Sequence, residues 1–148
     1  MQLNGQKLIE ASPEVCFRLF IDPEVLVRTM PGLKHLEPAG QGTYAAEMEM
    51  GVAAIRGHYS GTMTIKDVVE DKSYRLAMDG QGPGGFVNVD IAVHFEPDEK
   101  GCQVVYDGEA KVGGTVAGVG QRMLSGVAGF IMNQFFGNVA KEARKVRE

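Results

Sequence analysis

The side chains best suited to acid–base or metal chemistry are few in this chain and stand far apart. His35, His58 and His94 are isolated along the sequence, and none belongs to an HExxH motif. Cys16 and Cys102 form no CxxC pair, and no base is visible near either, so we interpret both as small buried hydrophobic residues. The sequence therefore predicts no catalytic residue and no metal site.

Two further patterns have simple structural interpretations. Carboxylates alternate along predicted strands, as at Glu47 and Glu49 or at Asp107 and Glu109, which is typical of a solvated strand face. The glycine-rich segment 80–85 is similar to a phosphate-binding loop, but it lacks the Lys, the Ser/Thr and the following helix. Because it joins two predicted strands, we interpret it as a flexible hairpin at the mouth of a cavity, where it would gate access.

The most informative pattern is a set of tyrosines and methionines that share one strand face. Polar and apolar residues alternate along the predicted strands, and the apolar positions define an inner face. All four tyrosines and four of the eight methionines fall on that face: Tyr44, Tyr59, Tyr74, Tyr106, Met48, Met50, Met63 and Met78. Methionine adapts its shape and a buried tyrosine hydroxyl needs a partner, so this lining suits an apolar cavity with a few polar anchors. A solid core whose hydroxyls reach the rim is the alternative that the pattern leaves open.

The length and composition of the chain exclude several classes of protein. The 148 residues suit one domain, residues 1–148, with a single core. A hydrophobic share of 44% and a charged share of 23% exclude disordered and fibrous classes. The net charge of -4 argues against nucleic-acid binding. The first ten residues lack the pattern of a secretory signal and cysteines are few, so we expect a cytoplasmic protein.

Two short helices are predicted near the N-terminus, after a first strand over residues 3–11. Segments 12–14 (Ser-Pro-Glu) and 22–24 (Asp-Pro-Glu) each combine a capping side chain, a proline and an acid that suits the positive end of a helix dipole. We therefore expect helices over residues 13–20 and 23–29.

The middle of the chain, residues 33–112, predicts antiparallel strands. Hydrophobic residues there alternate with polar ones, and turn-forming residues separate the alternating segments. Glycines inside the segments, at Gly57, Gly61 and Gly108, indicate bends. We therefore expect an α+β fold with a curved antiparallel sheet of about seven strands, two short helices and one long C-terminal helix.

That long helix is predicted from about residue 117 or 120 to 146, because apolar residues recur there at helical spacing. It is the one predicted element long enough to cover the dry face of the sheet. Residues 123–140 carry no charge, but their amides and hydroxyls are too numerous for a membrane span. We interpret three glycines in this helix as thinning the wall beside a pocket, with close helix–sheet packing as the alternative: Gly126, Gly129 and Gly137.

Two separated motifs resemble those of a known family. Segment 22–26 (Asp-Pro-Glu-Val-Leu) followed by 30–32 (Met-Pro-Gly) is similar to the "DPxxL…PG" signature of the CoxG family, the G subunit proteins of carbon monoxide dehydrogenase within the START-like superfamily. Segment 106–122, which begins Tyr-Asp-Gly-Glu-Ala, resembles the second signature of that family, and Phe135-Phe136 matches as well. The resemblance covers nearly the whole chain.

The resemblance implies a helix-grip fold around a deep apolar cavity. It further implies an accessory protein associated with molybdenum hydroxylases of the CO dehydrogenase type and with their attachment to the membrane. The motif residues carried over have structural roles, such as the capping Asp22 and the turn-forming Pro31. Two departures are Cys16-Phe17, where relatives often have Trp, and the end of the chain at Glu148, without the hydrophobic anchor of some relatives. We therefore expect peripheral contact with the inner face of a membrane rather than insertion.

We expect the protein to bind a hydrophobic ligand without catalysis, as an accessory protein to a molybdenum hydroxylase. The ligand would be a lipid or a quinone-like molecule whose carbonyls accept hydrogen bonds from tyrosine hydroxyls, and no other cofactor is predicted. The residues predicted to line the cavity are Phe20, Met30, Met48, Tyr59, Met63, Met78, Val89, Tyr106, Met123, Val127 and Ile131.

Two alternatives belong to other functional classes. One is a cyclase- or dehydratase-type enzyme of the same superfamily, which would need an inward acid or base, such as His58 or His94 after a one-residue register slip. The other is an assembly chaperone that acts through its surface.

Overall fold

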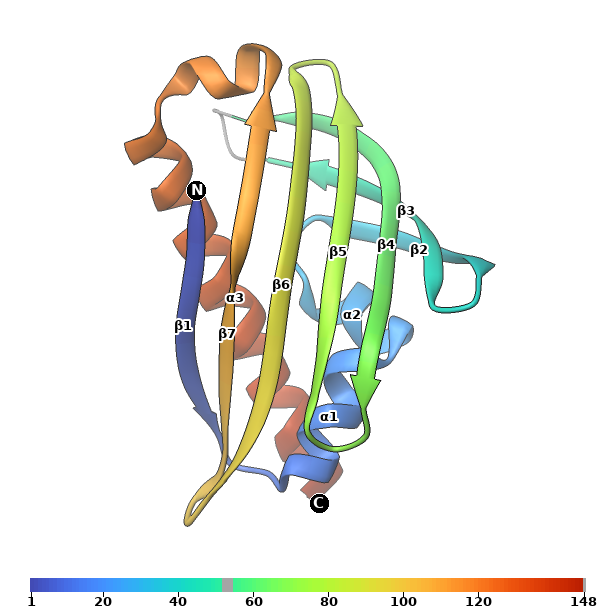
Figure 1. Cartoon of the computed structure of the whole chain (residues 1–148), viewed down its shortest axis with the longest axis vertical. Coiled ribbons are helices and arrows are strands. Elements are labelled where there is room, and N and C mark those ends of the chain that lie inside the picture. The colour runs from blue at the N-terminus through green and yellow to red at the C-terminus, as the bar shows by residue number, and fades with distance from the viewer. Residues whose placement is uncertain (52–54, 148) are drawn as a thin grey trace.

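The computed structural model describes residues 1–51 and 55–147, which form one curved sheet, three α-helices and a 3-10 helix (Figure 1). The strands are β1 (Gln2–Ile9), β2 (Leu33–Gly40), β3 (Thr43–Met50), β4 (Gly57–Val69), β5 (Ser73–Gly82), β6 (Gly85–Asp98) and β7 (Gly101–Gly113). The helices are α1 (Pro13–Ile21), α2 (Pro23–Thr29), the 3-10 helix η2 (Gly114–Val119) and α3 (Gln121–Arg147). These elements confirm the predicted fold class.

The sheet has the strand order β1-β7-β6-β5-β4-β3-β2, and every neighbouring pair is antiparallel. Strands β2 to β7 are a meander, while β1 crosses over to pair with β7, so β1 and β2 are the edge strands. Figure 1 shows α3 running diagonally along one face of the sheet, with α1 and α2 near the C-terminal end of α3 and η2 at the opposite end. The concave space between the sheet and α3 is where a ligand site was predicted.

Both short helices begin as their sequences predict. The Ser12 hydroxyl accepts a hydrogen bond from the Val15 amide at 3.2 Å, and the Asp22 carboxylate accepts one from the Glu24 amide at 2.9 Å. Each cap satisfies a backbone amide that the first helical turn leaves without a partner. The first strand ends at Ile9, two residues earlier than predicted, because the chain turns there to reach the Ser12 cap.

The strand register confirms that the four tyrosines share one face. Residues paired directly across neighbouring strands point to the same side of a sheet. The pairs that link the tyrosines and methionines run across the sheet as Tyr44–Met63, Met48–Tyr59, Met63–Met78, Tyr74–Val93 and Val93–Tyr106. This face is the one that α1 and α3 cover.

Glycines allow backbones to approach closely where the sheet bends, as predicted. A Cβ atom at Gly61 would lie 1.6 Å from the Asp79 carbonyl oxygen, and a Cβ at Gly108 would lie 2.0 Å from that of Asp90. Gly57 has φ 142°, a conformation that side chains rarely tolerate. Strand β4 curves strongly in Figure 1, and its concave side faces the helices.

The core is densest where α1 meets the second half of α3. Phe20 is 1% exposed, and its ring lies 5.4 Å from that of Phe95, 5.5 Å from Phe135 and 5.8 Å from Phe136. Edge-to-face and tilted contacts of this kind stabilise beyond the area that they bury. Phe20 was predicted to line the cavity, but it is instead the centre of this aromatic cluster, because α1 packs its apolar face directly between the sheet and α3.

The two halves of α3 are held very differently. The second half is fixed to α2, because the Asn138 amide donates to the Thr29 carbonyl at 2.9 Å and Arg28 pairs with Glu142 at 2.8 Å. In the first half, by contrast, Met123 is 53% exposed and Phe130 is 54% exposed. No helix in residues 1–51 and 55–147 combines the length and apolarity needed to cross a membrane.

Candidate ligand-binding site

The inward-facing side chains of the concave face are buried at one end and half-buried at the other, which we call its open end. Leu76 and Ile91 are buried near α1. Farther along the same strands, toward η2, the facing pair Met78 and Val89 is half-buried, as is Tyr106 on β7. Since all of these side chains point inward, the concave face is less completely covered toward η2 than near α1.

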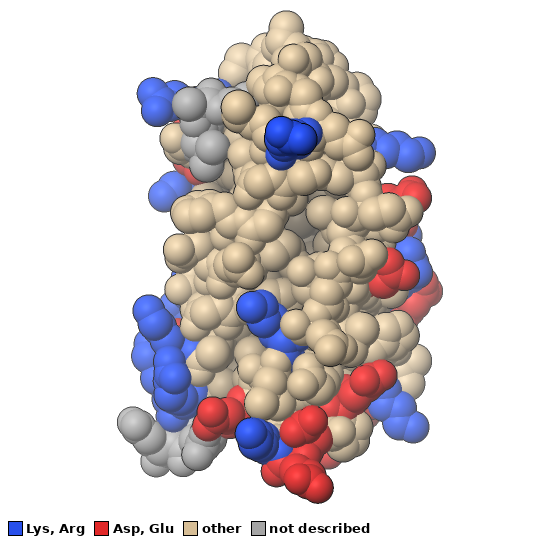
Figure 2. All heavy atoms as spheres, turned by 90° about the vertical axis from the view of Figure 1, so that its left-hand side faces the viewer, with Lys and Arg blue, Asp and Glu red and all other residues tan. Residues whose placement is uncertain are grey.

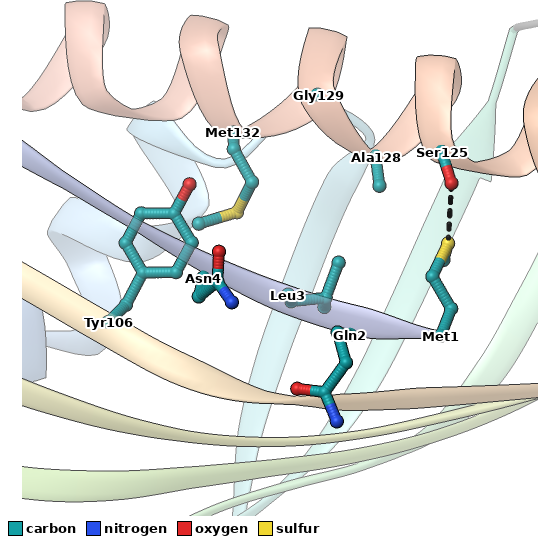
Figure 3. Close-up of a pocket in the computed structure, with 9 residues that line it drawn as sticks. All are labelled: Met1, Gln2, Leu3, Asn4, Tyr106, Ser125, Ala128, Gly129 and Met132. Carbon is teal, nitrogen blue, oxygen red and sulfur yellow. Dashed lines mark hydrogen bonds between the residues drawn. The ribbon is translucent and has the colours of Figure 1, made fainter.

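The middle of the side formed by β1 and α3 carries few charged side chains and is hollowed, whereas charged side chains gather at its lower end and edges (Figure 2). A pocket of about 170 Å³ lies between these two elements (Figure 3). It is lined by Met1, Gln2, Leu3, Asn4, Tyr106, Ser125, Ala128, Gly129 and Met132. A second hollow, of about 270 Å³, lies between α2 and β2 beside Arg28 and His35 and contains none of the predicted ligand residues.

Tyr106 is positioned in the first pocket by two neighbours. Its ring stacks on Phe136, with centroids 5.4 Å apart, and its hydroxyl lies over Gly5, where a Cβ atom would come within 2.6 Å of the oxygen. Gly5 pairs with Tyr106 across β1 and β7, so the absent side chain makes room for the ring. The ring and hydroxyl point toward Met132 on α3 in Figure 3.

The Tyr106 hydroxyl is available as a hydrogen-bond donor. In the part of the chain that the structure describes, no hydrogen bond is formed by this hydroxyl, whereas the Tyr74 hydroxyl donates to the Phe20 carbonyl at 3.3 Å. Burial raises the pKa of Tyr106 above its usual value, so the phenol stays protonated at neutral pH. Tyr59 is 4% exposed, and burial raises the pKa of its phenol as well.

The eleven predicted lining residues occupy three environments. Phe20, Tyr59 and Met63 are buried, and Met123 is exposed at the start of α3. The remaining seven are half-buried: Met30, Met48, Met78, Val89, Tyr106, Val127 and Ile131. Of the predicted set, Tyr106 lines the pocket between β1 and α3.

The glycine-rich hairpin is attached to η2. The Gly84 carbonyl accepts hydrogen bonds from the Val116 amide at 2.8 Å and from the Thr115 hydroxyl at 2.9 Å. A Cβ atom at Gly82 would lie 2.7 Å from the Tyr59 ring, so this hairpin also packs on the inner face. The sequence did not reveal η2, and η2 is the element that fastens the hairpin.

Sequence reasoning missed the contribution of β1 to the pocket. Leu3 and Asn4 were assigned only to a first strand, and the crossover that pairs β1 with β7 brings them beside α3. The one signal was Gly5 inside a predicted strand, since such a glycine often marks a close approach. Cys16 and Cys102 are buried, as predicted, and a hydrogen bond between the two thiols raises the pKa of Cys16.

His58 and His94 lie outside the pocket between β1 and α3. His58 is on the outer face, 2.8 Å from Glu49 and in contact with Glu47, and hydrogen bonds to these carboxylates raise its pKa. His94 is exposed on β6, and its neighbours in sequence, Val93 and Phe95, are the residues that point inward. The register slip that the enzyme alternative required does not occur.

Solved structures of other proteins share this fold. A START superfamily protein from Mycobacterium smegmatis is similar, with a TM-score of 0.72, 14% sequence identity and 98% coverage of both chains. Protein CV1439 from Chromobacterium violaceum has a TM-score of 0.71 at 14% identity and covers 96% of each chain. These likenesses show that the chain has a START-like fold.

Further matches define the family. A conserved protein from Geobacillus kaustophilus, known from its crystal structure, has a TM-score of 0.95 and 34% identity, covering 98% of this chain and 96% of its own. The family described as the G subunit of carbon monoxide dehydrogenase (CoxG) matches residues 5–144. The chain therefore belongs to the CoxG family, which confirms the resemblance seen in its two motifs. A comparison with curated proteins gives no match.

Proposed function

We propose that this protein binds a hydrophobic ligand between the sheet and α3, as a non-catalytic accessory to a molybdenum hydroxylase of the CO dehydrogenase type. CoxG membership and the START-like fold support a ligand-binding accessory protein in general. The observation that carries the proposal is the open end of the concave face, where the inward-facing Met78 and Val89 are half-buried and Tyr106 lines the pocket.

The dimensions of the site suit a ligand with a ring and an apolar chain. The open pocket of about 170 Å³ is similar in volume to a cavity of about 150 Å³ that accepts benzene, and it has a more polar lining that includes Gln2, Asn4 and Ser125. Methionine side chains change rotamer readily, so Met48, Met78 and Met132 would adapt to a chain that extends along the concave face. Each buried CH₂ contributes about 0.8 kcal/mol before the entropy cost of binding.

A quinone-like head group fits the polar side of this pocket best. Quinone carbonyls accept hydrogen bonds, and the Tyr106 hydroxyl is a free donor in a partly desolvated place, where such a bond is stronger than in water. Ligands without a hydrogen-bond acceptor would gain binding free energy only from the burial of their apolar chains. Comparing a quinone with such a ligand therefore tests the role of the head group separately from that of the chain.

Tyr106→Phe is expected to weaken binding of a short-chain naphthoquinone by roughly 2- to 10-fold, because one hydrogen bond contributes about 0.5–1.5 kcal/mol. Isothermal titration calorimetry would measure the change. Tyr44→Phe is the matched control, since Tyr44 shares the inner face but does not line the pocket. Equal affinities for both variants and the native protein would show that Tyr106 does not contact the head group.

Val127→Trp is expected to lower ligand affinity by about tenfold or more, which is about 1.4 kcal/mol, while the fold is retained. Val127 is half-buried on the first half of α3, and an indole there would occupy the hollow that the ligand needs. Phe130→Trp is the control, because Phe130 is 54% exposed on the same helix. Unchanged ligand retention by Val127→Trp would mean that this side chain faces elsewhere.

The partner enzyme is tested separately from the ligand. We propose that the protein contacts its hydroxylase, and a membrane peripherally, while carrying the ligand. Affinity capture from the native host with native protein and with Val127→Trp distinguishes the roles. Recovery of the hydroxylase with both forms would favour a chaperone that acts through its surface, and recovery with the native form alone would favour a ligand carrier.

A further inference from the structure

We propose that Cys16 on α1 and Cys102 on β7 form a reversible disulfide when the protein meets a peroxide, and that this bond locks α1 to the sheet. Neither residue lines the pocket between β1 and α3. The inference is therefore independent of the proposed ligand, and it adds a redox-sensitive lock to the fold.

The two cysteines are brought together where β1, α1 and β7 meet. Cys102 is the second residue of β7 and pairs with Ile9 at the end of β1. Gly101 lies so close to the chain leaving β1 that a Cβ there would come within 2.3 Å of the Ile9 carbonyl oxygen and 3.0 Å of the Ala11 carbonyl oxygen. The Cys16 thiol donates to that same Ala11 carbonyl at 3.8 Å. Cys16 and the start of β7 therefore contact the same short segment, although they are distant in sequence.

Each thiol has the other as its side-chain neighbour in the core. Both side chains are 0% exposed and belong to one cluster of buried residues, and a hydrogen bond joins the two thiols. Both are free thiols, and they are the two cysteines of the whole sequence. A disulfide within one molecule therefore has a single possible pairing. Where an intracellular protein forms such a bond, the bond is usually transient and redox-sensing.

The contact makes the two sulfurs chemically different. The Cys16 thiol donates a hydrogen bond to the Cys102 sulfur, and this bond lowers the pKa of Cys102 and raises the pKa of Cys16. The thiolate is the form of cysteine that attacks an oxidant. Cys102 is therefore the sulfur that reacts first, and Cys16 is the resolving thiol.

The reaction balances with hydrogen peroxide as the oxidant. The Cys102 thiolate attacks one peroxide oxygen, the O–O bond breaks, and the hydroxide that leaves takes up the proton lost by Cys102. The Cys16 sulfur then attacks the sulfur of the resulting sulfenic acid, the S–O bond breaks, and the leaving hydroxide takes up the Cys16 proton. Two thiols and one peroxide give one disulfide and two waters, with two electrons passing from sulfur to oxygen. A dithiol reductant reverses the bond by exchange.

Burial determines the rate of this reaction, and the position of the bond determines its effect. Neither sulfur is exposed, so peroxide reaches the pair during local opening of α1. Urea below the unfolding transition should therefore speed the oxidation. A bond between residues 16 and 102 closes a long loop and restricts the unfolded chain, so the oxidised protein should unfold at a higher temperature.

Peptide mapping without reductant tests the proposal on the native protein. The protein is incubated with hydrogen peroxide, alkylated in denaturant, digested and analysed by mass spectrometry. We expect a peptide pair joined through Cys16 and Cys102, which dithiothreitol releases. The melting temperature should rise by roughly 10 °C on oxidation and return on reduction.

Cys16→Ala and Cys102→Ala are the matched controls. Peroxide also oxidises methionine, and both variants retain all eight methionines, so a rise in melting temperature that neither variant shows belongs to the disulfide. The proposal is overturned if both thiols of the native protein stay free, or if they are oxidised to sulfinic or sulfonic acids without the joined peptides. A joined pair that leaves the melting temperature unchanged would contradict the lock.

Discussion

Phe20→Ala should lower the free energy of unfolding by about 3–5 kcal/mol, the cost typical of removing a large buried aromatic side chain. Phe20 is 1% exposed and contacts the rings of Phe95, Phe135 and Phe136, so its loss leaves a cavity where α1, the sheet and α3 meet. Urea denaturation followed by circular dichroism measures the change, with a constant slope showing that the transition stays two-state.

Phe130→Ala is the control for this experiment. Phe130 is also on α3, but it is 54% exposed, and its removal should change stability by less than about 0.5 kcal/mol. A cost at Phe20 no greater than the cost at Phe130 would contradict the view that an aromatic cluster fixes the second half of α3.

Gly61→Ala should destabilise the protein by about 2 kcal/mol or more, because an added methyl group that meets backbone forces the sheet to shift. The new Cβ would lie 1.6 Å from the Asp79 carbonyl oxygen, and this atom cannot rotate away as the tip of a side chain could. The concave curvature of β4 depends on this approach, so the shift would also alter the hollow. Thermal unfolding and ligand affinity are the two measurements.

Gly126→Ala is the matched control and has the opposite expected sign. Apart from the backbone of α3 itself and the two chain neighbours, no described atom lies within 4 Å of a Cβ at Gly126, so the substitution should stabilise α3 by up to about 1 kcal/mol through helix propensity alone. Equal effects at Gly61 and Gly126 would show that neither the bend nor the packing at Gly61 is needed.

The fold was largely predictable because local rules agree with tertiary packing here. Residues 12–14 and 22–24 cap two helices, and strict alternation between polar and apolar residues identified the inner face, including all four tyrosines. The long helix was recognisable from its period, and it begins at Gln121 because Gly120 adopts φ 95° and ends the 3-10 turn.

The site was less predictable because it depends on which elements meet. Helical periodicity predicts that Phe20 faces inward. How deeply α1 packs between the sheet and α3 decides that Phe20 lies in the core and not beside a cavity, and the sequence does not show this depth. Met1 and Ser125 lie 124 positions apart in the sequence, and only the crossover of β1 to β7 places them around one pocket. The sequence predicts a flexible hairpin at residues 80–85, because it does not show that η2 holds the hairpin by hydrogen bonds. Six residues of 3-10 helix are too short to produce a recognisable helical period.

The central claim is that the open end of the concave face holds a hydrophobic ligand. Organic extraction of protein purified from its native host, followed by mass spectrometry, tests this claim most directly. The account predicts recovery of one class of amphiphile, with a ring or oxygen-bearing head and an apolar chain, in amounts that Val127→Trp reduces and Phe130→Trp does not. Repeated extracts without any such molecule, from protein that also fails to bind added quinones or fatty acids, would contradict it.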